Sequence, residues 1–444
     1  MDDPEDRADA HRILIGSTKE FAHLPGSDLL ARVDPFYAWQ QSRREMSLWS
    51  YGKVSYSAPR AECSVRYDDG TAFAGVNLAT QDYLGLSSHP AILDAARRAM
   101  YAHGVHSGGS GVLLGRTRFG TDLEAALCDY LHMEHAVLFP TGWGAGFGAI
   151  QGLVREDDHI VIDERAHACL QQGAHAATRR VHRVRHLDTA AFERTLTAIR
   201  AGDTRNAILV VTESLFSMDS DTPDIAALQA LCDDYKATLL VDVAHDIGAV
   251  GVDGRGFVGK QGMLGRVDLL IGSFSKTFAS NGGFVLTHSR AVKEYLMVFA
   301  STHIFSNALS PVQAAVVGAA LDIVRSPAGA AMRHALAARA TQLRAALSAA
   351  GLTCLGDRSP IVPVAFADEA LARLTTRALP ARGVVANLVE YPGVPRGTAR
   401  LRLQLMAAHS PRQIRQAAEG IGAAYRGAIV ERVAYPSIGG DTSC

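Results

Sequence analysis

One lysine, Lys276, stands among small hydroxyl and glycine residues in the stretch GSFSKTFASNGG. The apolar run VDLLI comes directly before it and is typical of a buried strand. Burial lowers the pKa of a lysine, and the neutral amine that results can form a Schiff base with an aldehyde. A lysine that binds phosphate, or one that faces solvent, would also suit this stretch taken alone.

Two further segments could serve the same chemistry. Asp242 ends an apolar run in VDVAHDIG, and a buried carboxylate there could hold a ring nitrogen in its protonated form. His245 follows three residues later and could support Asp242 or contact a ring hydroxyl. In FPTGWGAG a strand leads into small residues, so the backbone amides of Gly142 and Trp143 could form an anion cup at a helix N-terminus. A strand-end aspartate and a tight turn are the ordinary structural alternatives.

These features point to one cofactor because they converge. Ligands gather at the carboxyl ends of the strands in open α/β sheets, and Glu213, Asp242 and Lys276 are all expected at such ends. Ser273 could donate a hydrogen bond to a phosphate held nearby. A carboxylate for a ring nitrogen, an amine for an aldehyde and an anion cup together describe a site for pyridoxal 5′-phosphate (PLP).

The elements that must position these groups form an alternating pattern. Apolar runs and amphipathic stretches alternate from about residue 76 to 290, which predicts an α/β fold with a mostly parallel sheet and helices on both faces. The basic segment TRRVHRVRH is interpreted as a solvated strand face. A hairpin with DDG at its bend precedes this region, and an alanine-rich stretch from Pro311 to about Ala350 predicts one long connecting helix. The predicted strands are 136–140, 159–163, 207–215, 237–245, 267–275 and 282–288.

The same patterns suggest four parts. These are an N-terminal helical and hairpin segment over 1–75, a large cofactor-binding domain over 76–310, a connecting helix with a small α+β domain over 311–430, and a loose tail over 431–444.

Composition limits the partners. The 444 residues are 48% hydrophobic, typical of a soluble globular protein, and carry 44 basic against 45 acidic side chains. This balance gives no electrostatic case for nucleic acid or an anionic membrane, and no apolar run is long enough to span a bilayer. Scattered cysteines without metal spacing, and no visible signal peptide, predict a cytoplasmic protein.

Eight motifs occur in one order along the chain: NLATQDYLGLSSHP, HSGGSG, FPTGWGAG, DERAHACL, TESLFSMDSD, VDVAHDIGAVG, SFSKTFAS and GTARLRLQLMAAHS. With them, residues from about 75 to 425 resemble the α-oxoamine synthase family of fold-type-I PLP-dependent transferases. That family includes 8-amino-7-oxononanoate synthase, glycine C-acetyltransferase, 5-aminolevulinate synthase and serine palmitoyltransferase. The resemblance implies a decarboxylative condensation of an amino acid with an acyl thioester, giving an α-amino ketone, carbon dioxide and a free thiol.

In this resemblance four side chains act on the PLP ring or on the substrate. Lys276 bonds the PLP aldehyde and later acts as the base at the amino-acid α-carbon. Asp242 pairs with the ring nitrogen, and His245 lies near the phenolic oxygen of the ring. His167, in RAHACL, stacks over the ring and contacts the substrate.

Further residues would hold the phosphate or line the site. The resemblance places the phosphate against Gly142 and Trp143, where the family usually has Gly-Phe, with a hydroxyl from Ser273. Glu213 and Ser217 would line the site.

The substrate residues follow from the same resemblance. Arg402 would bind the amino-acid carboxylate, with Arg400 as the alternative because the two alternate along one strand. Gln81 stands near the substrate where the family commonly has Asn, and Asp246 stands where it usually has Gly. The family builds its site at a homodimer interface, so Ser306 of IFSNALSP would come from the second chain.

Several readings remain open. The chain is also similar to oxoamine synthase units attached to polyketide-type assembly lines, which would make the acyl donor a carrier-protein thioester rather than acyl-CoA. An aminotransferase or decarboxylase could use the same aspartate and lysine. A non-catalytic subunit of a synthase complex is disfavoured by the presence of Lys276, and a dinucleotide enzyme by the lack of a GxGxxG fingerprint. The amino acid and the acyl length depend on pocket shape, which spacing does not reveal.

Overall fold

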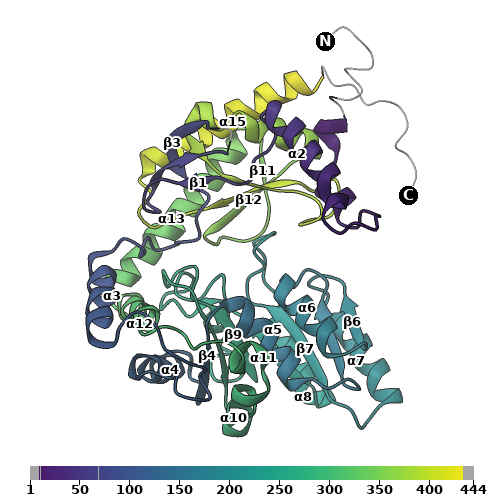
Figure 1. Ribbon diagram of the computed structural model, residues 1–444, viewed down its shortest axis with the longest axis vertical. Helices are drawn as coiled ribbons and strands as arrows, with labels where there is room; N and C mark the ends of the chain where they lie inside the picture. The colour runs from purple at the N-terminus through teal and green to yellow at the C-terminus, as the bar shows by residue number, and fades with distance from the viewer. Residues whose placement is uncertain (1–9, 11, 69, 434–444) are drawn as a thin grey trace. The chain divides into compact units, whose positions relative to one another are not determined.

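The computed structural model describes residues 10, 12–68 and 70–433, and the chain divides into two compact units (Figure 1). The larger unit is Gln81–Ala337, and the smaller one joins the described residues up to Thr80 to those from Ala338 onward. Contacts therefore group the N-terminal segment with C-terminal residues, whereas the four-part division kept them apart. Most of the predicted tail, from residue 434, lies outside the described residues, as do the first nine positions.

A seven-stranded sheet forms the centre of the larger unit. The parallel pairs run from β6 to β9, and β10 is antiparallel to both of its neighbours. The mostly parallel α/β fold is thereby confirmed, and the basic segment of the sequence forms the edge strand β6. The order is β4 (His135–Phe139), β10 (Gly283–Thr287), β9 (Leu269–Ser273), β8 (Thr238–Asp242), β7 (Ile208–Glu213), β5 (His159–Asp163) and β6 (Val181–Val184).

Both faces of this sheet are buried, as continuous apolar strands predict. Ile160, Ile162 and Val211 belong to a core shared with helices α5, α6 and α10. Val161 and Val210, which point the other way, are fully buried as well, because α7 and α8 cover the second face (Figure 1). The helices of this unit are α3 (Pro90–His103), α4 (Arg118–Leu131), α5 (Gly142–Leu153), α6 (Ala168–Ala177), α7 (Thr189–Gly202), α8 (Ile225–Tyr235), α9 (Gly256–Lys260), α10 (Arg290–Phe299), α11 (Ser301–Ile304) and α12 (Pro311–Arg325).

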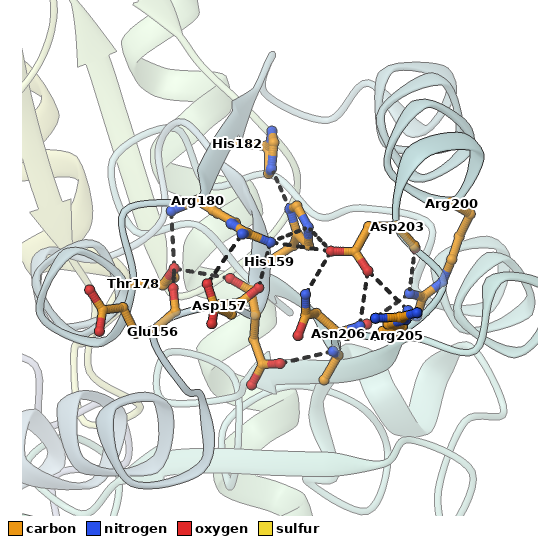
Figure 2. Close-up of polar contacts among 12 residues, drawn as sticks. Glu156, Asp157, His159, Thr178, Arg180, His182, Arg200, Asp203, Arg205 and Asn206 are labelled. Carbon is orange, nitrogen blue, oxygen red and sulfur yellow. Dashed lines mark hydrogen bonds and ion pairs between the residues drawn. The ribbon is translucent and has the colours of Figure 1, made fainter.

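The basic residues near β6 belong to a polar network at the amino-terminal edge of β5 and β6 (Figure 2). The Arg180 guanidinium lies 3.2 Å from a carboxylate oxygen of Asp203 and equally close to one of Asp157. Nδ1 of His159 lies 3.0 Å from Nε2 of His182, while its Nε2 lies 3.1 Å from Asp203. Carboxylates thus balance the basic segment, at the edge of the sheet opposite to the strand ends where ligands gather.

The prediction of a single connecting helix is wrong, because the segment forms two helices. α12 (Pro311–Arg325) and α13 (Pro327–Ala349) meet at a bend of 78°. Pro327 disfavours a helical backbone at the residue before it, and Ser326 is extended, with φ −84° and ψ 164°. The Ser326 hydroxyl accepts a hydrogen bond from the N–H of Gly329 (3.2 Å) at the start of the second helix. Within the described ranges, no single helix is long and apolar enough to span a membrane. The two helices of this bent pair meet the length and composition criteria only when they are taken together.

The smaller unit is built from both ends of the chain. The predicted hairpin is confirmed as β2 and β3, and β3 also pairs in parallel with β13. Strands β11, β12, β15 and β14 form a second, antiparallel sheet in that order. The bounds are β1 (Val54–Ser55), β2 (Glu62–Arg66), β3 (Ala72–Asn77), β11 (Thr353–Cys354), β12 (Ile361–Ala365), β13 (Val384–Val385), β14 (Asn387–Val389), β15 (Arg400–Gln404), α2 (Asp34–Glu45), α14 (Glu369–Arg377) and α15 (Pro411–Arg432).

Candidate active site

Most of the predicted site residues line one cavity at the carboxyl edge of the larger sheet. Its volume is about 270 Å³, and its walls come from the ends of β7, β8 and β9 and from the starts of α5 and α6. The predicted residues that meet there are Gly142, Trp143, His167, Glu213, Asp242, His245, Ser273 and Lys276. The other lining residues are Thr141, Cys169, Ala244, Ile271, Gly272, Ser275, Asn281 and Gly282.

The N-terminus of α5 forms one end of this cavity. Thr141 precedes the helix, and its Oγ1 accepts a hydrogen bond from the N–H of Gly144 (2.9 Å). A Cβ atom on Gly142 would lie 2.5 Å from Oγ of Ser273, so the helix approaches β9 too closely for any side chain at this position. The positive end of the helix dipole and the Ser273 hydroxyl together make a cradle for a phosphate.

Two buried carboxylates occupy adjacent strand ends. Glu213 and Asp242 pair in the register of β7 and β8 and are 4% and 9% exposed. Burial raises the pKa of both carboxyl groups, and the charge of Asp242 raises the pKa of Glu213 further. The positive charge of Lys276, followed by that of His167, partly counteracts burial and lowers the pKa of Asp242. A protonated ring nitrogen beside Asp242 would stabilise its ionised form in the same way.

His167 is held in one orientation at the start of α6. Its backbone N–H donates to Oε1 of Glu213 (2.6 Å), and its Nδ1 accepts from the N–H of Cys169 (3.3 Å). Because Nδ1 is an acceptor, the neutral ring carries its proton on Nε2. The indole of Trp143 stands edge-on to this imidazole, with the ring centroids 6.0 Å apart. His167 and Trp143 therefore form one aromatic wall of the cavity.

His245 has a buried partner that sequence reasoning missed. The hydroxyl oxygen of Tyr83 lies 3.0 Å from Nδ1 of His245, and Tyr83 is fully buried. The only available signal was that Tyr83 belongs to the motif TQDYLGL, two residues after Gln81. This contact orients the imidazole that lines the cavity.

Asp246 lies behind the cavity and is also fully buried. Its carboxylate accepts hydrogen bonds from Oγ of Ser214 (2.8 Å) and from the N–H of Phe257 (2.7 Å). Burial raises the pKa of Asp246 to about 7. A side chain at Gly256, where φ is +66°, would collide with this carboxylate. Asp246 thus connects the segment after β7, the segment after β8 and the first residues of α9.

Lys276 lies in the loop that joins β9 to β10. The N–H of Phe274 donates to the carbonyl of Gly282 (2.9 Å), and the N–H of Ser280 donates to the carbonyl of Phe274 (3.2 Å). Lys276 is half-buried and lines the cavity, where its charge acts on Asp242. The loop is closed at its base, which holds the lysine amine at the strand ends rather than in solvent.

Five predicted residues do not line this cavity. Ser217 is buried after β7, whereas Ser306, after α11, and Gln81 are half-buried. Arg400 and Arg402 lie on β15 in the smaller unit, where Arg400 is 3% exposed and donates from Nε to a nearby backbone carbonyl (3.0 Å). The roles assigned to these five residues, like those assigned to the residues that line the cavity, stay predictions.

Comparison with known proteins agrees with this geometry. Residues 74–421 match the family described as aminotransferase class I and II. Over 344 residues, covering 78% of this chain and 88% of the relative, the chain is 38% identical to an 8-amino-7-oxononanoate synthase of Klebsiella pneumoniae. A solved serine palmitoyltransferase with a PLP internal aldimine matches with a TM-score of 0.84 and 27% identity, over 91% of this chain and 100% of that one. The 8-amino-7-oxononanoate synthase of Francisella tularensis shares the fold (TM-score 0.64, 23% identity, 80% and 98% covered).

The fold and the site define a PLP-dependent transferase of fold type I. Within the aminotransferase class I and II family, the chain belongs to the α-oxoamine synthases.

The residues of the cavity fit PLP. The close contact between Gly142 and Ser273 leaves a backbone cradle at a helix N-terminus, which suits a phosphate. Asp242 offers a buried carboxylate for the ring nitrogen, and Lys276 offers an amine for the aldehyde.

Proposed function

We propose that this protein condenses an amino acid with an acyl thioester, releasing carbon dioxide and a free thiol and forming an α-amino ketone. The observation that carries the proposal is the meeting of Lys276, Asp242 and His167 with the α5 cradle in one cavity of about 270 Å³. The relationship to 8-amino-7-oxononanoate synthase supports this reaction over aminotransfer or simple decarboxylation.

Each of these residues has its own role in the reaction. When bound, PLP supplies an electron sink that stabilises negative charge at the amino-acid α-carbon. The Lys276 amine takes the proton from the α-carbon and later returns a proton to the product. Asp242 keeps the ring nitrogen protonated, and the Nε2 proton of His167 is placed to bind an acidic oxygen of the substrate. Arg402 binds the amino-acid carboxylate, with Arg400 as the alternative.

The partners are proposed on the same basis. The acyl donor is a thioester of coenzyme A or of an acyl-carrier protein. Two copies of the chain form a homodimer, in which Ser306 of one copy serves the site of the other. A cytoplasmic location is part of the same proposal.

A spectroscopic titration followed by a thiol assay tests the function. The purified protein is loaded with PLP and titrated with a panel of amino acids, and the amino substrate is expected to shift the visible absorption band. Candidate thioesters are then added, and free thiol should appear in a one-to-one ratio with the amino acid consumed. An aminotransferase or a decarboxylase would consume the amino acid without releasing thiol, which would contradict the proposal. A protein that never acquires the band would point instead to a non-catalytic subunit.

A further inference from the structure

A second cavity lies within the smaller unit. Its volume is about 370 Å³, larger than that of the cavity fitted to PLP. All of its lining residues belong to the smaller unit, so it is distinct from the PLP cavity. A volume in this range is typical of sites for small organic ligands.

Aromatic rings form the side walls of this cavity. Trp49 and Tyr51 meet edge to face with their ring centroids 5.0 Å apart. Tyr67 and Phe73 are stacked, with their centroids 6.0 Å apart and an angle of 21° between the rings. All four residues line the cavity. Flat apolar surfaces of this kind favour a ligand with an aromatic or otherwise flat apolar body.

A buried positive charge lines one wall of the cavity. Arg373 on α14 lines the cavity and is 2% exposed. Its Nε donates to Oε2 of Glu390 (2.6 Å), and the Arg43 guanidinium lies 3.5 Å from the other oxygen of the same carboxylate. Burial and the neighbouring charge of Arg373 lower the pKa of Arg43 to about 10. Two buried guanidinium groups thus share one carboxylate, and buried charge is costly unless it is paired.

Other side chains around the cavity add to this excess of positive charge. Arg44 pairs with Asp68 (2.7 Å), and Arg377 pairs with Glu431, so these two pairs are neutral. The Lys53 amine lies 5.6 Å from the centre of the Tyr67 ring, and burial lowers the pKa of Lys53 to about 8. Among the described residues, the cavity lining, its ion-pair partners and Lys53 together hold five cations and three carboxylates.

We propose that this cavity binds a small organic anion whose flat apolar body lies between the aromatic walls and whose acidic group approaches Arg373. The anion would supply the negative charge that the pair of buried guanidinium groups lacks. The site is independent of the condensation reaction.

A fluorescent probe of this chemistry tests the proposal. Anilinonaphthalene sulfonate is an aromatic anion, and phenylnaphthylamine is its uncharged counterpart. Both are titrated into the PLP-loaded protein and followed by probe fluorescence. The anion is expected to bind at one site per chain, at least about tenfold more tightly than the neutral probe, because hydrogen bonds to charged groups are stronger than those between neutral groups. Equal affinity for the two probes would overturn the proposal.

Two alanines on one strand provide a matched pair of variants. Ala72 and Ala74 both lie on β3 and are exposed, but only Ala72 lines the cavity. Ala72→Trp should fill the space and weaken binding of the anionic probe at least about tenfold, whereas Ala74→Trp should leave its affinity unchanged. Binding that survives Ala72→Trp undiminished would place the probe elsewhere and would contradict the proposal.

A charge variant gives a second measurement. Arg373→Gln leaves Arg43 and Glu390 as a balanced pair, so it should remove the preference for the anionic over the neutral probe. The same fluorescence titration measures it, provided that the thermal unfolding midpoint shows a folded protein. If this variant does not fold, the alanine pair still decides the question.

Discussion

The hydroxyl oxygen of Tyr83 lies 3.0 Å from Nδ1 of His245, and this contact connects the TQDYLGL motif to the PLP cavity. Tyr83→Phe removes the hydrogen bond but keeps the buried ring. We expect the PLP dissociation constant to rise about fivefold, since such a bond contributes about 1 kcal/mol. Titration of the cofactor-free protein with PLP measures it. Tyr130→Phe is the control, because this buried tyrosine bonds the carbonyl of Asp253 outside the cavity and should leave PLP affinity unchanged.

Lys276→Ala should abolish thiol release and remove the absorption band of lysine-bound PLP. The fold should persist, because Lys276 is half-buried in a loop whose backbone bonds do not involve its side chain. Lys260→Ala, at an exposed helix position, should keep both signals. A Lys276→Ala protein that still formed amino ketone would rule out the role proposed for this lysine.

Gly142→Ala should weaken PLP binding at least about tenfold, because the new methyl group would lie 2.5 Å from Oγ of Ser273 and force α5 away from β9. Gly120→Ala is a suitable control. Its Cβ would be 3.7 Å from the nearest atom, and it lies within α4, so it should leave PLP affinity unchanged and slightly raise the unfolding midpoint. Equal PLP affinity in the two variants would contradict the proposal that the N-terminus of α5 holds the phosphate.

Asp246 should make stability fall as the pH rises. Burial raises its pKa from 3.8 to about 7, so the folded protein holds this proton more tightly than the unfolded chain does. The contribution is fully present below the unfolded pKa and is lost as the pH rises through 7. Between about pH 5.5 and pH 8 it should cost about 2 kcal/mol of unfolding free energy.

Asp246→Asn tests this directly, because an amide resembles the neutral acid: its oxygen can accept from the N–H of Phe257 and its NH2 can donate to Oγ of Ser214. The variant should show a smaller loss of unfolding midpoint between the two pH values than the parent protein. The same pH dependence in both proteins would show that another group is responsible.

Substitutions of Arg400 and Arg402 should have different effects, one on stability and the other on the KM for the amino acid. Arg402→Gln is expected to raise the KM for the amino acid about tenfold or more, since it removes a charged contact to a carboxylate. Arg400→Gln should instead lower the unfolding midpoint, because Arg400 is 3% exposed and bonds the backbone. The opposite pattern would assign the carboxylate to Arg400.

Local signals in the sequence predicted most of the fold and much of the cavity. Strand ends are readable because apolar runs stop at polar residues, and Glu213, Asp242 and Ser273 are the last residues of their strands. The break at Ser326 was also readable, since a proline follows it. The contact between Tyr83 and His245 was not, because the two residues are 162 positions apart in the sequence.

The second cavity was beyond sequence reasoning for a similar reason. Arg43 on α2 and Glu390 after β14 are separated by 347 positions, and they meet only in the folded chain. A buried arginine and an exposed one look alike in a sequence. Only the folded smaller unit shows that Arg43 and Arg373 share the carboxylate of Glu390.

The antiparallel strand β10 decides when the active site can exist during synthesis. In the larger sheet, as described, β10 alone joins β4 to the remaining strands, with Phe139 opposite Gly283. A nascent chain that has emerged as far as β9 therefore has β4, the strand that leads into the α5 cradle, without a partner in an unfinished sheet. We expect the ribosome-bound protein to capture PLP only after β10 has inserted between β4 and β9, so that cofactor capture marks the completion of this sheet.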